Sequence, residues 1–364
     1  MPKKLINQFL KYELKTEIIK PFKSNELQHK YDDIKNKLDI AKTQLDKITP
    51  ENYFDLMKYM DIYLNMKKVL KTNYNMQVTT NASMKMYEMI CECKLINDSL
   101  NAFCNAELPG AFISTINHYC KTNNISYKWV ASSYMPDDEH LGDKYGIYKN
   151  HSKNWLMNEN NNGDVTNIKN LLDFEKRVKD INLYTSDAGI DVSEDYNNQE
   201  DLTLWINYGQ ILTGLLTLAN GGNFCTKQYT FFNPFTRSVI TILSYLFDEF
   251  YITKPVTSRP SNSEIYLIGK NYNKSKFAKF RDIMLKALEN KDLTILCEIN
   301  ENMFESTYDI HMLQQIAFLN ELFTYYNTRI SMLEKKRLYD YYNNIINDWI
   351  KKYNVKMLKL NEYL

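Results

Sequence analysis

The sequence has no apolar run long enough to cross a membrane and no strong excess of charge of either sign. A membrane-spanning helix needs about 18 or more consecutive apolar residues, and no run in this chain reaches that length. Lys and Arg total 45 against 44 Asp and Glu, which leaves a formal net charge of +1. We therefore expect no membrane span, and any contact with nucleic acid must come from a local basic patch.

Cysteine and histidine are too scattered for a zinc site. The six cysteines contain no CxxC pair, and the five histidines do not cluster near them. A disulfide framework is also unexpected in a chain of 364 residues. The first residues, MPKKLINQFLKYELK, include lysines but no apolar core of a signal peptide. We expect a reduced, soluble, intracellular protein without a metal.

The hydrophobic pattern of the chain changes twice along its length. Residues 1–75 have apolar residues at helical spacing, and so do residues 273–364, which are also rich in Tyr and Lys. Between them, over residues 76–272, short apolar runs alternate with helical segments. We predict a central α/β domain at 76–272, an N-terminal helical extension at 1–75 and a C-terminal helical extension at 273–364.

The central region predicts six strands. Their expected ranges are 101–108, 126–134, 181–189, 223–231, 249–255 and 263–272. Helices are expected between most of them, and the Asn-rich stretch 136–167 is expected to be mainly loop. Strands that alternate with helices form a mainly parallel sheet covered on both faces. The last two strands, joined by a loop, indicate an antiparallel edge.

Polar residues and a tight turn follow the ends of these strands. Gly110 in the Pro-Gly turn of CNAELPGAFI removes a Cβ where backbone can approach a ligand, and the helix that follows favours an anionic or carboxylate group. Asp187, Lys227 and Glu264 lie at three strand termini about forty residues apart. Each has an ordinary structural explanation: a helix cap, a solvated lysine and an edge-strand charge. Their common position favours one site.

The motifs around these residues resemble the FtsJ-like ribose 2′-O-methyltransferases, in the branch of mRNA cap-1 enzymes from eukaryotes and large DNA viruses. The segments that carry the resemblance are TNASMKMYEM, FCNAELPGAFI, NNGDVT, LYTSDAGIDV, GGNFCTKQYTFFNPFT and KPVTSRPSNSEIYLIGK. The resemblance covers roughly 76–272. It implies a Rossmann-like methyltransferase fold with a mainly parallel seven-stranded sheet, an antiparallel edge strand and S-adenosyl-L-methionine as cofactor.

The family uses a Lys-Asp-Lys-Glu tetrad for catalysis. Asp187, Lys227 and Glu264 match its last three members, and Lys85 in NASMKMYEM matches the first, with Lys94 as the alternative. A free lysine has a pKa of about 10.4 and cannot take the proton of a ribose hydroxyl at pH 7. We expect a second ammonium at Lys85 and partial burial to lower the pKa of Lys227, which would then act as the general base.

The resemblance also implies positions for the cofactor. Leu108, Pro109, Gly110 and Ala111 would pass under its methionine part, and Asp187 borders the same site. Asp164 would lie near the adenine. The second strand ends in VASSY, without the acid that holds the cofactor ribose in many methyltransferases. Ser132 or Ser133 is the expected substitute.

For RNA, the segment KPVTSRPSNSE supplies Lys254, Arg259, Asn262 and Ser263 beside Glu264. Arg259 is expected to hold a phosphate near the reacting nucleotide. Aromatic residues after Lys227 would stack on a base or on the methylated guanine of a cap, although such residues more often form core. They are Phe231, Phe232 and Tyr229.

Three functions stay open from the sequence. The first is cap-1 methylation of capped mRNA in the host cytoplasm, in a viral factory, with other capping or transcription proteins as further partners and packaging in the virion as a possible addition. The second is 2′-O-methylation of rRNA or tRNA. The third is a catalytically silent RNA-binding or virion scaffold. The four tetrad residues argue against the third function, and the missing second-strand acid argues for it.

Overall fold

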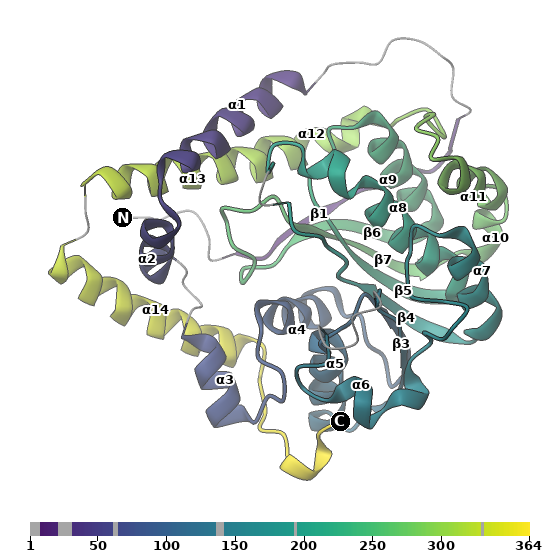
Figure 1. The fold of residues 1–364 in the computed structure, drawn as a ribbon, viewed down its shortest axis with the longest axis horizontal. Coiled ribbons are helices and arrows are strands. Elements are labelled where there is room, and N and C mark those ends of the chain that lie inside the picture. Colours follow the sequence, from purple (N-terminus) through teal and green to yellow (C-terminus); the bar gives the residue numbers. More distant parts are fainter. Residues whose placement is uncertain (1–7, 21–30, 61–64, 136–141, 193–194, 329–330) are drawn as a thin grey trace.

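The computed structural model describes residues 8–20, 31–60, 65–135, 142–192, 195–328 and 331–364 (Figure 1). Seven strands of this part form one sheet in the order β1-β6-β7-β5-β4-β2-β3. Their bounds are β1 Leu10–Glu13, β2 Ser99–Asn105, β3 Ser126–Ala131, β4 Ile181–Ser186, β5 Leu218–Gln228, β6 Phe247–Lys254 and β7 Ile265–Tyr272. The predicted fold class, a mainly parallel α/β sheet of the methyltransferase type, is confirmed.

The sheet is parallel in its centre and antiparallel toward one end. Strands β3, β2, β4 and β5 run parallel, whereas β7 pairs antiparallel with both β5 and β6. The outermost strand on that side is β1, which pairs antiparallel with β6 from Leu10 opposite Lys254 to Glu13 opposite Tyr251. The expectation that residues 1–75 are helical is therefore wrong at Leu10–Glu13, which complete the sheet instead.

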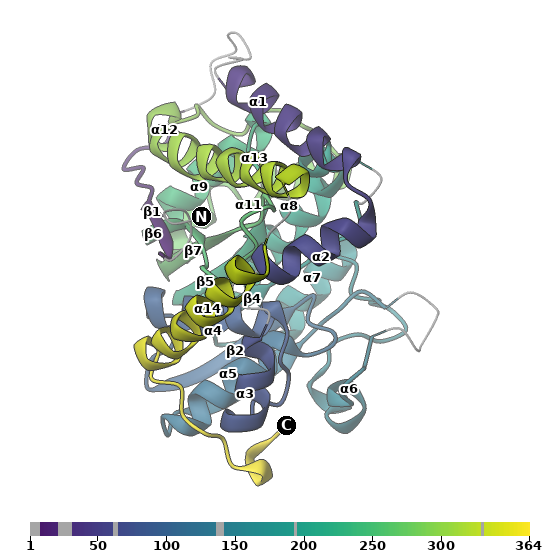
Figure 2. The same ribbon diagram turned by 90° about the vertical axis from the view of Figure 1, so that its left-hand side faces the viewer.

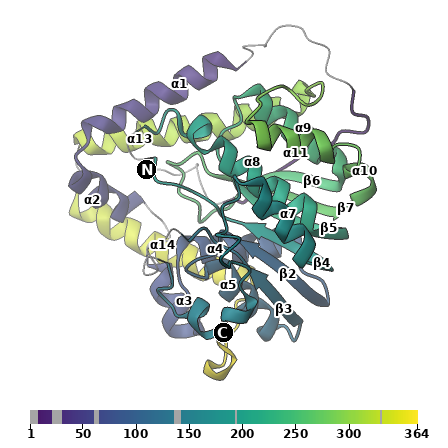
Figure 3. The ribbon, with the colours of Figure 1, turned by 45° about the vertical axis from the view of Figure 1, so that its right-hand side comes forward.

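Helices cover both faces of the sheet, and the pleat sends alternate side chains to each (Figure 3). Phe103, Tyr184 and Phe224 point to the face covered by α7 Ile168–Arg177, α8 Gln199–Thr217 and α9 Pro234–Leu246. Neighbouring Cys104, Leu183 and Cys225 point to the face covered by α4 Asn81–Cys93 and α5 Ala111–Thr122. Burying one large apolar side chain stabilises the folded state by roughly 1.5–3 kcal/mol. Because both faces of the sheet bury many such side chains, the packing fixes the strands relative to one another and with them the positions of their ends.

The remaining helices belong mostly to the two terminal segments. They are α1 Asp32–Thr43, α2 Pro50–Met60, α3 Met66–Tyr74, α6 Ile147–Asn150, α10 Lys274–Phe277, α11 Arg281–Asn290, α12 Glu305–Thr307, α13 Leu313–Thr328 and α14 Met332–Lys352. Figure 2 shows α1, α2, α13 and α14 together on the side of the molecule that faces the viewer, in front of the sheet. Among the described helices, none is long and apolar enough to cross a membrane.

Local sequence signals explain where the helices next to the sheet begin. Thr80 and Ser83 form a capping box at the start of α4, in which each side chain accepts from the other residue's backbone N–H. Asn233 caps α9 by accepting from the N–H of Phe235, and Pro234 occupies the first helical position. These caps fix where α4 leaves the loop before it and where the chain turns after β5.

Candidate active site

The predicted tetrad comes together at one edge of the sheet. Asp187 directly follows β4, Lys227 is near the end of β5, and Glu264 directly precedes β7. Because β7 runs antiparallel to β5, its start lies beside the end of β5, where Lys227 pairs with Tyr266. Lys85 reaches this edge from α4. Lys94, the alternative first lysine, is exposed at the end of that helix and is not in this group.

The four residues form two nearly buried ion pairs. Lys85 Nζ lies 2.6 Å from Glu264 Oε1, and Lys227 Nζ lies 3.3 Å from Asp187 Oδ1. Their side chains are 8–18% exposed. Tyr266 donates a hydrogen bond of 2.9 Å to the same Asp187 oxygen. Burial alone would raise the pKa of Glu264, but the positive charges of Lys85, Lys227 and Lys254 lower it to about 2. Glu264 is therefore a carboxylate at neutral pH.

The charge state of Lys227 differs from the expectation. Burial lowers its pKa, as anticipated, but the Asp187 carboxylate, Tyr229 and Glu264 raise it more, and the net pKa lies above that of a free lysine. Lys85 does not offset this effect because its own ammonium is paired with Glu264. The predicted lowering of the Lys227 pKa is wrong, and Lys227 is an ammonium at pH 7.

The backbone around Asp187 and Lys227 is held from both sides. Lys227 Nζ donates to the main-chain oxygen of Asp187 at 3.0 Å. Gln210 of α8 donates to the Lys227 carbonyl at 2.7 Å and accepts from the N–H of Ala188 at 3.2 Å. A Cβ on Gly189 would lie 2.9 Å from Lys227 Nζ. Because glycine has no Cβ, the loop after β4 can pass this close to the lysine ammonium without displacing it.

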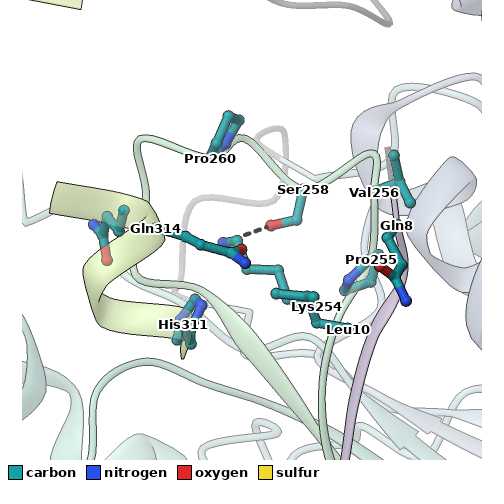
Figure 4. Close-up of a pocket in the computed structure, with 10 residues that line it drawn as sticks. Gln8, Leu10, Lys254, Pro255, Val256, Ser258, Pro260, His311 and Gln314 are labelled. Atoms are coloured by element: carbon teal, nitrogen blue, oxygen red, sulfur yellow. Dashed lines mark hydrogen bonds between the residues drawn. The ribbon is translucent and has the colours of Figure 1, made fainter. Parts of the chain in front are cut away.

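The loop between β6 and β7 carries Glu264 and is fastened by a buried lysine. Lys254 Nζ donates to the main-chain oxygens of Glu264 at 2.7 Å and Asn262 at 2.9 Å, and to Asn262 Oδ1 at 2.8 Å. Figure 4 shows its further hydrogen bond to Ser258 in a pocket that His311 also lines. Burial lowers the pKa of Lys254 to about 7. Lys254 is thus part of the loop's framework rather than a surface contact for RNA.

Leu108, Pro109 and Gly110 form the predicted turn between β2 and α5, and Ala111 is the first residue of α5, but the N-terminus of this helix is already occupied. Oε1 of Glu107 accepts from the N–H groups of Phe112 at 2.7 Å and Ile113 at 3.0 Å. Burial raises the pKa of this carboxyl to about 8. An external carboxylate, expected at this helix start, would have to displace Glu107. Leu108 and Pro109 are half-buried and border the turn.

Two serines follow β3, at the same edge of the sheet. Ser133 Oγ accepts from the N–H of Leu108 at 3.2 Å and so belongs to the turn's support. Ser132 Oγ is fully buried and has no hydrogen-bond partner among the described residues. Buried hydroxyls are rarely left unpaired, so a bound small molecule that reached Ser132 would satisfy it. The Ser132 hydroxyl is thus one group at this end of the sheet that fits a polar atom of a small cofactor.

The other predicted contacts divide into exposed and buried positions. Asp164 is half-buried, and its Oδ1 accepts from the N–H and hydroxyl of Thr166, both at 2.8 Å, as in a turn. Arg259 is exposed on the loop between β6 and β7. Ser263 is 1% exposed and exchanges a hydrogen bond with Gln315.

Phe231 is fully buried, with its ring 4.7 Å from that of Tyr308. It offers no face to a base, so the predicted stacking contact is wrong.

Sequence reasoning missed Tyr266, Glu107 and Glu88. Tyr266 lies two residues after Glu264, and this spacing places both side chains on one face of an extended segment. Glu107 precedes a helix start and Glu88 follows Lys85 by one helical turn, so position alone could have suggested both. Among the described residues, no group of three or more His, Cys, Asp or Glu could hold a metal ion.

Sequence comparison relates this chain to known methyltransferases. The family model for FtsJ-like methyltransferases matches residues 78–272. A protein of African swine fever virus (isolate Warthog/Namibia/Wart80/1980) named "Probable methyltransferase EP424R" is 44% identical over 294 residues, which cover 75% of this chain and 69% of that protein. The "Cap-specific mRNA (nucleoside-2′-O-)-methyltransferase 2" of Pongo abelii is 28% identical over 66% of this chain and 33% of its own length.

Among solved structures, a putative ribosomal RNA methyltransferase from Plasmodium falciparum matches with a TM-score of 0.39 and 18% identity, over 53% of this chain and 97% of that one. The match to the family model spans the turn after β2 and the strand termini that hold Asp187, Lys227 and Glu264. On the family match and the viral relative, the chain belongs to the FtsJ-like methyltransferase family.

Proposed function

We propose that this chain is an S-adenosylmethionine-dependent methyltransferase that methylates the 2′-hydroxyl of the first transcribed nucleotide of capped mRNA. The observation that carries the proposal is the convergence of Lys85, Asp187, Lys227 and Glu264 in two buried ion pairs at the strand ends. The relatives named as methyltransferases, one of them cap-specific, support the choice of reaction and RNA.

The cofactor would lie along Leu108 and Pro109, with the unpartnered hydroxyl of Ser132 as a hydrogen-bonding group. When bound, S-adenosylmethionine supplies a methyl group that its sulfonium makes electrophilic. The protein must then align the ribose oxygen with that carbon and provide for the hydroxyl proton. Both tasks fall to residues at the end of β5 and in the loop after β4.

Lys227 is the residue that takes the hydroxyl proton in this proposal. It does so from its neutral form, which is scarce at pH 7 because its pKa is raised. Once protonated, its ammonium is stabilised by Asp187 at 3.3 Å. Lys85 and Glu264 form an ion pair at 2.6 Å, so neither leaves an unpaired buried charge beside the reacting groups.

The test is methyl transfer from labelled S-adenosylmethionine to three short RNAs that begin with a 7-methylguanosine cap, an unmethylated cap or a triphosphate. Nuclease digestion then identifies which ribose carries the label. We expect label on the first transcribed nucleotide of the capped RNA. Label on the second nucleotide would overturn the assignment of position, and label only on structured rRNA or tRNA would overturn the assignment of substrate.

A further inference from the structure

Glu88 carries a fully buried carboxyl group that is not part of the tetrad. It lies one turn after Lys85 on α4. Its Oε2 accepts from the N–H of Val256 at 2.6 Å, and its Oε1 accepts from the N–H of Thr257 at 2.9 Å and from Trp349 Nε1 at 3.1 Å. Burial raises the pKa of this carboxyl group to about 7, while the hydrogen bonds from Thr257, Trp349 and Val256 lower it. Three donors from two distant segments converge here.

The first of these segments leads directly to the catalytic carboxylate. Val256 and Thr257 precede Ser258, whose hydroxyl donates to Glu264 Oε1 at 2.9 Å. That same oxygen accepts from Lys85 at 2.6 Å. Glu88 therefore fixes the loop that orients Glu264 while its own helix carries Lys85. A shift of this loop would change the Lys85–Glu264 distance.

The second segment is the C-terminal helix α14, which lies outside the residues matched by the family model. Trp349 packs its ring 5.9 Å from that of Tyr87 and directs its N–H to Glu88. One turn further along α4, Glu92 accepts from Tyr353 at 2.8 Å and pairs with Lys352. The hydrogen bond and ion pair of Glu92 thus join α4 to the end of α14, as Glu88 also does, but they do not involve the loop between β6 and β7.

We propose that Glu88 is a positioning residue for methyl transfer, through which the docked C-terminal helix holds the loop of Glu264 and the Lys85–Glu264 pair in register. This inference rests on the proposed function for its catalytic consequence. Its structural core, the fastening of the loop by Glu88, stands on the three hydrogen bonds. The C-terminal extension is then a working part of the active site rather than an appended domain.

The test compares Glu88→Gln with the matched control Glu92→Gln in the full-length chain. Glutamine keeps one acceptor oxygen but places an amide NH₂ against a backbone or indole N–H. We expect Glu88→Gln to lower kcat on capped RNA at least tenfold and to leave the KM for S-adenosylmethionine within threefold. Glu92→Gln, which loosens only the contact between α4 and α14, is expected to keep kcat within twofold.

Two further measurements keep the inference decidable. Trp349→Phe removes the indole N–H but retains an aromatic ring, and we expect a kcat between those of the two glutamine variants; it replaces Glu88→Gln if that variant does not fold. Hydrogen exchange of the Val256 and Thr257 amides tests the fastening without any activity. We expect faster exchange in Glu88→Gln, or in Trp349→Phe where it replaces that variant, than in wild type and Glu92→Gln.

The outcomes separate this inference from the proposed function. Equal exchange in these variants, or a kcat unchanged by both Glu88→Gln and Trp349→Phe, would overturn the role of Glu88. An equal loss of kcat in Glu92→Gln would show that helix docking alone matters and would also overturn it. A wild-type protein that transfers no methyl group to RNA, yet shows the expected exchange pattern, would refute the proposed function and leave the fastening by Glu88 supported.

Discussion

Replacing Gly189 with alanine is expected to displace the Lys227 ammonium while leaving the fold intact. A Cβ at this position would lie 2.9 Å from Lys227 Nζ and 3.3 Å from the Tyr229 hydroxyl. Non-bonded heavy atoms prefer a separation of about 3.5–4.0 Å, so the ammonium must move by roughly 0.6–1.1 Å. Gly189 itself is exposed, so the added methyl group creates no clash within the core.

A misplacement of about 1 Å at a reacting group can cost about 100-fold in rate, which corresponds to roughly 2.7 kcal/mol of activation free energy. The assay is single-turnover methyl transfer to capped RNA, beside the melting temperature and the cofactor affinity. Ile190→Ala, a change at the neighbouring half-exposed side chain, is the control. A Gly189→Ala enzyme with the wild-type rate would refute the claim that Lys227 must sit where the structure places it.

Three further predictions follow from charge and burial. Because the pKa of Lys227 is raised, its neutral form grows with alkalinity, and the single-turnover rate is expected to rise about tenfold per pH unit from pH 6.5 to 8.5; a plateau below pH 8 would contradict this role. The pKa of Glu107 is raised to about 8, so between about pH 4.5 and 8 the folded state keeps a proton that the unfolded chain has released. The stability that Glu107 contributes is therefore lost as the pH rises through this range. Glu107→Gln can keep both hydrogen bonds to Oε1 and is expected to flatten this decline in urea unfolding; an unchanged slope would argue against it. Phe231→Ala is expected to lower the free energy of unfolding by roughly 3–5 kcal/mol with no loss of RNA affinity per folded molecule, and weaker RNA binding at full stability would show that its burial is misassigned.

The strand-end residues were predictable because a mainly parallel sheet brings the ends of its strands to one edge. Asp187, Lys227 and Glu264 each follow or precede an apolar run, and the turn around Gly110 was equally visible. Their convergence agrees with that prediction, whereas their catalytic roles stay predictions. The ion pair of Lys85 with Glu264 joins residues 179 apart in sequence. It was anticipated only through the family resemblance, since helix spacing alone does not say where α4 packs.

The errors have a common physical origin in contacts between distant segments. The pKa of Lys227 depends on a carboxylate at 3.3 Å, and the sequence gives residue types without that distance. Phe231 is buried by Tyr308 from the C-terminal segment, which local pattern cannot reveal. The short segment Leu10–Glu13 has half-buried and exposed residues in alternation, and it becomes a strand because β6 offers an open edge. Tertiary pairing decided each of these cases.

The central claim is that Lys227, the buried lysine at the end of β5, takes the proton of the ribose hydroxyl during methyl transfer. The most direct test is the single-turnover rate on capped RNA for wild type and Lys227→Ala, with the affinity for S-adenosylmethionine measured on the same samples. General base catalysis contributes about 10²–10⁴-fold, so we predict a loss of at least about 100-fold with cofactor affinity within threefold. A Lys227→Ala enzyme that binds the cofactor and transfers methyl groups at the wild-type rate would contradict the account.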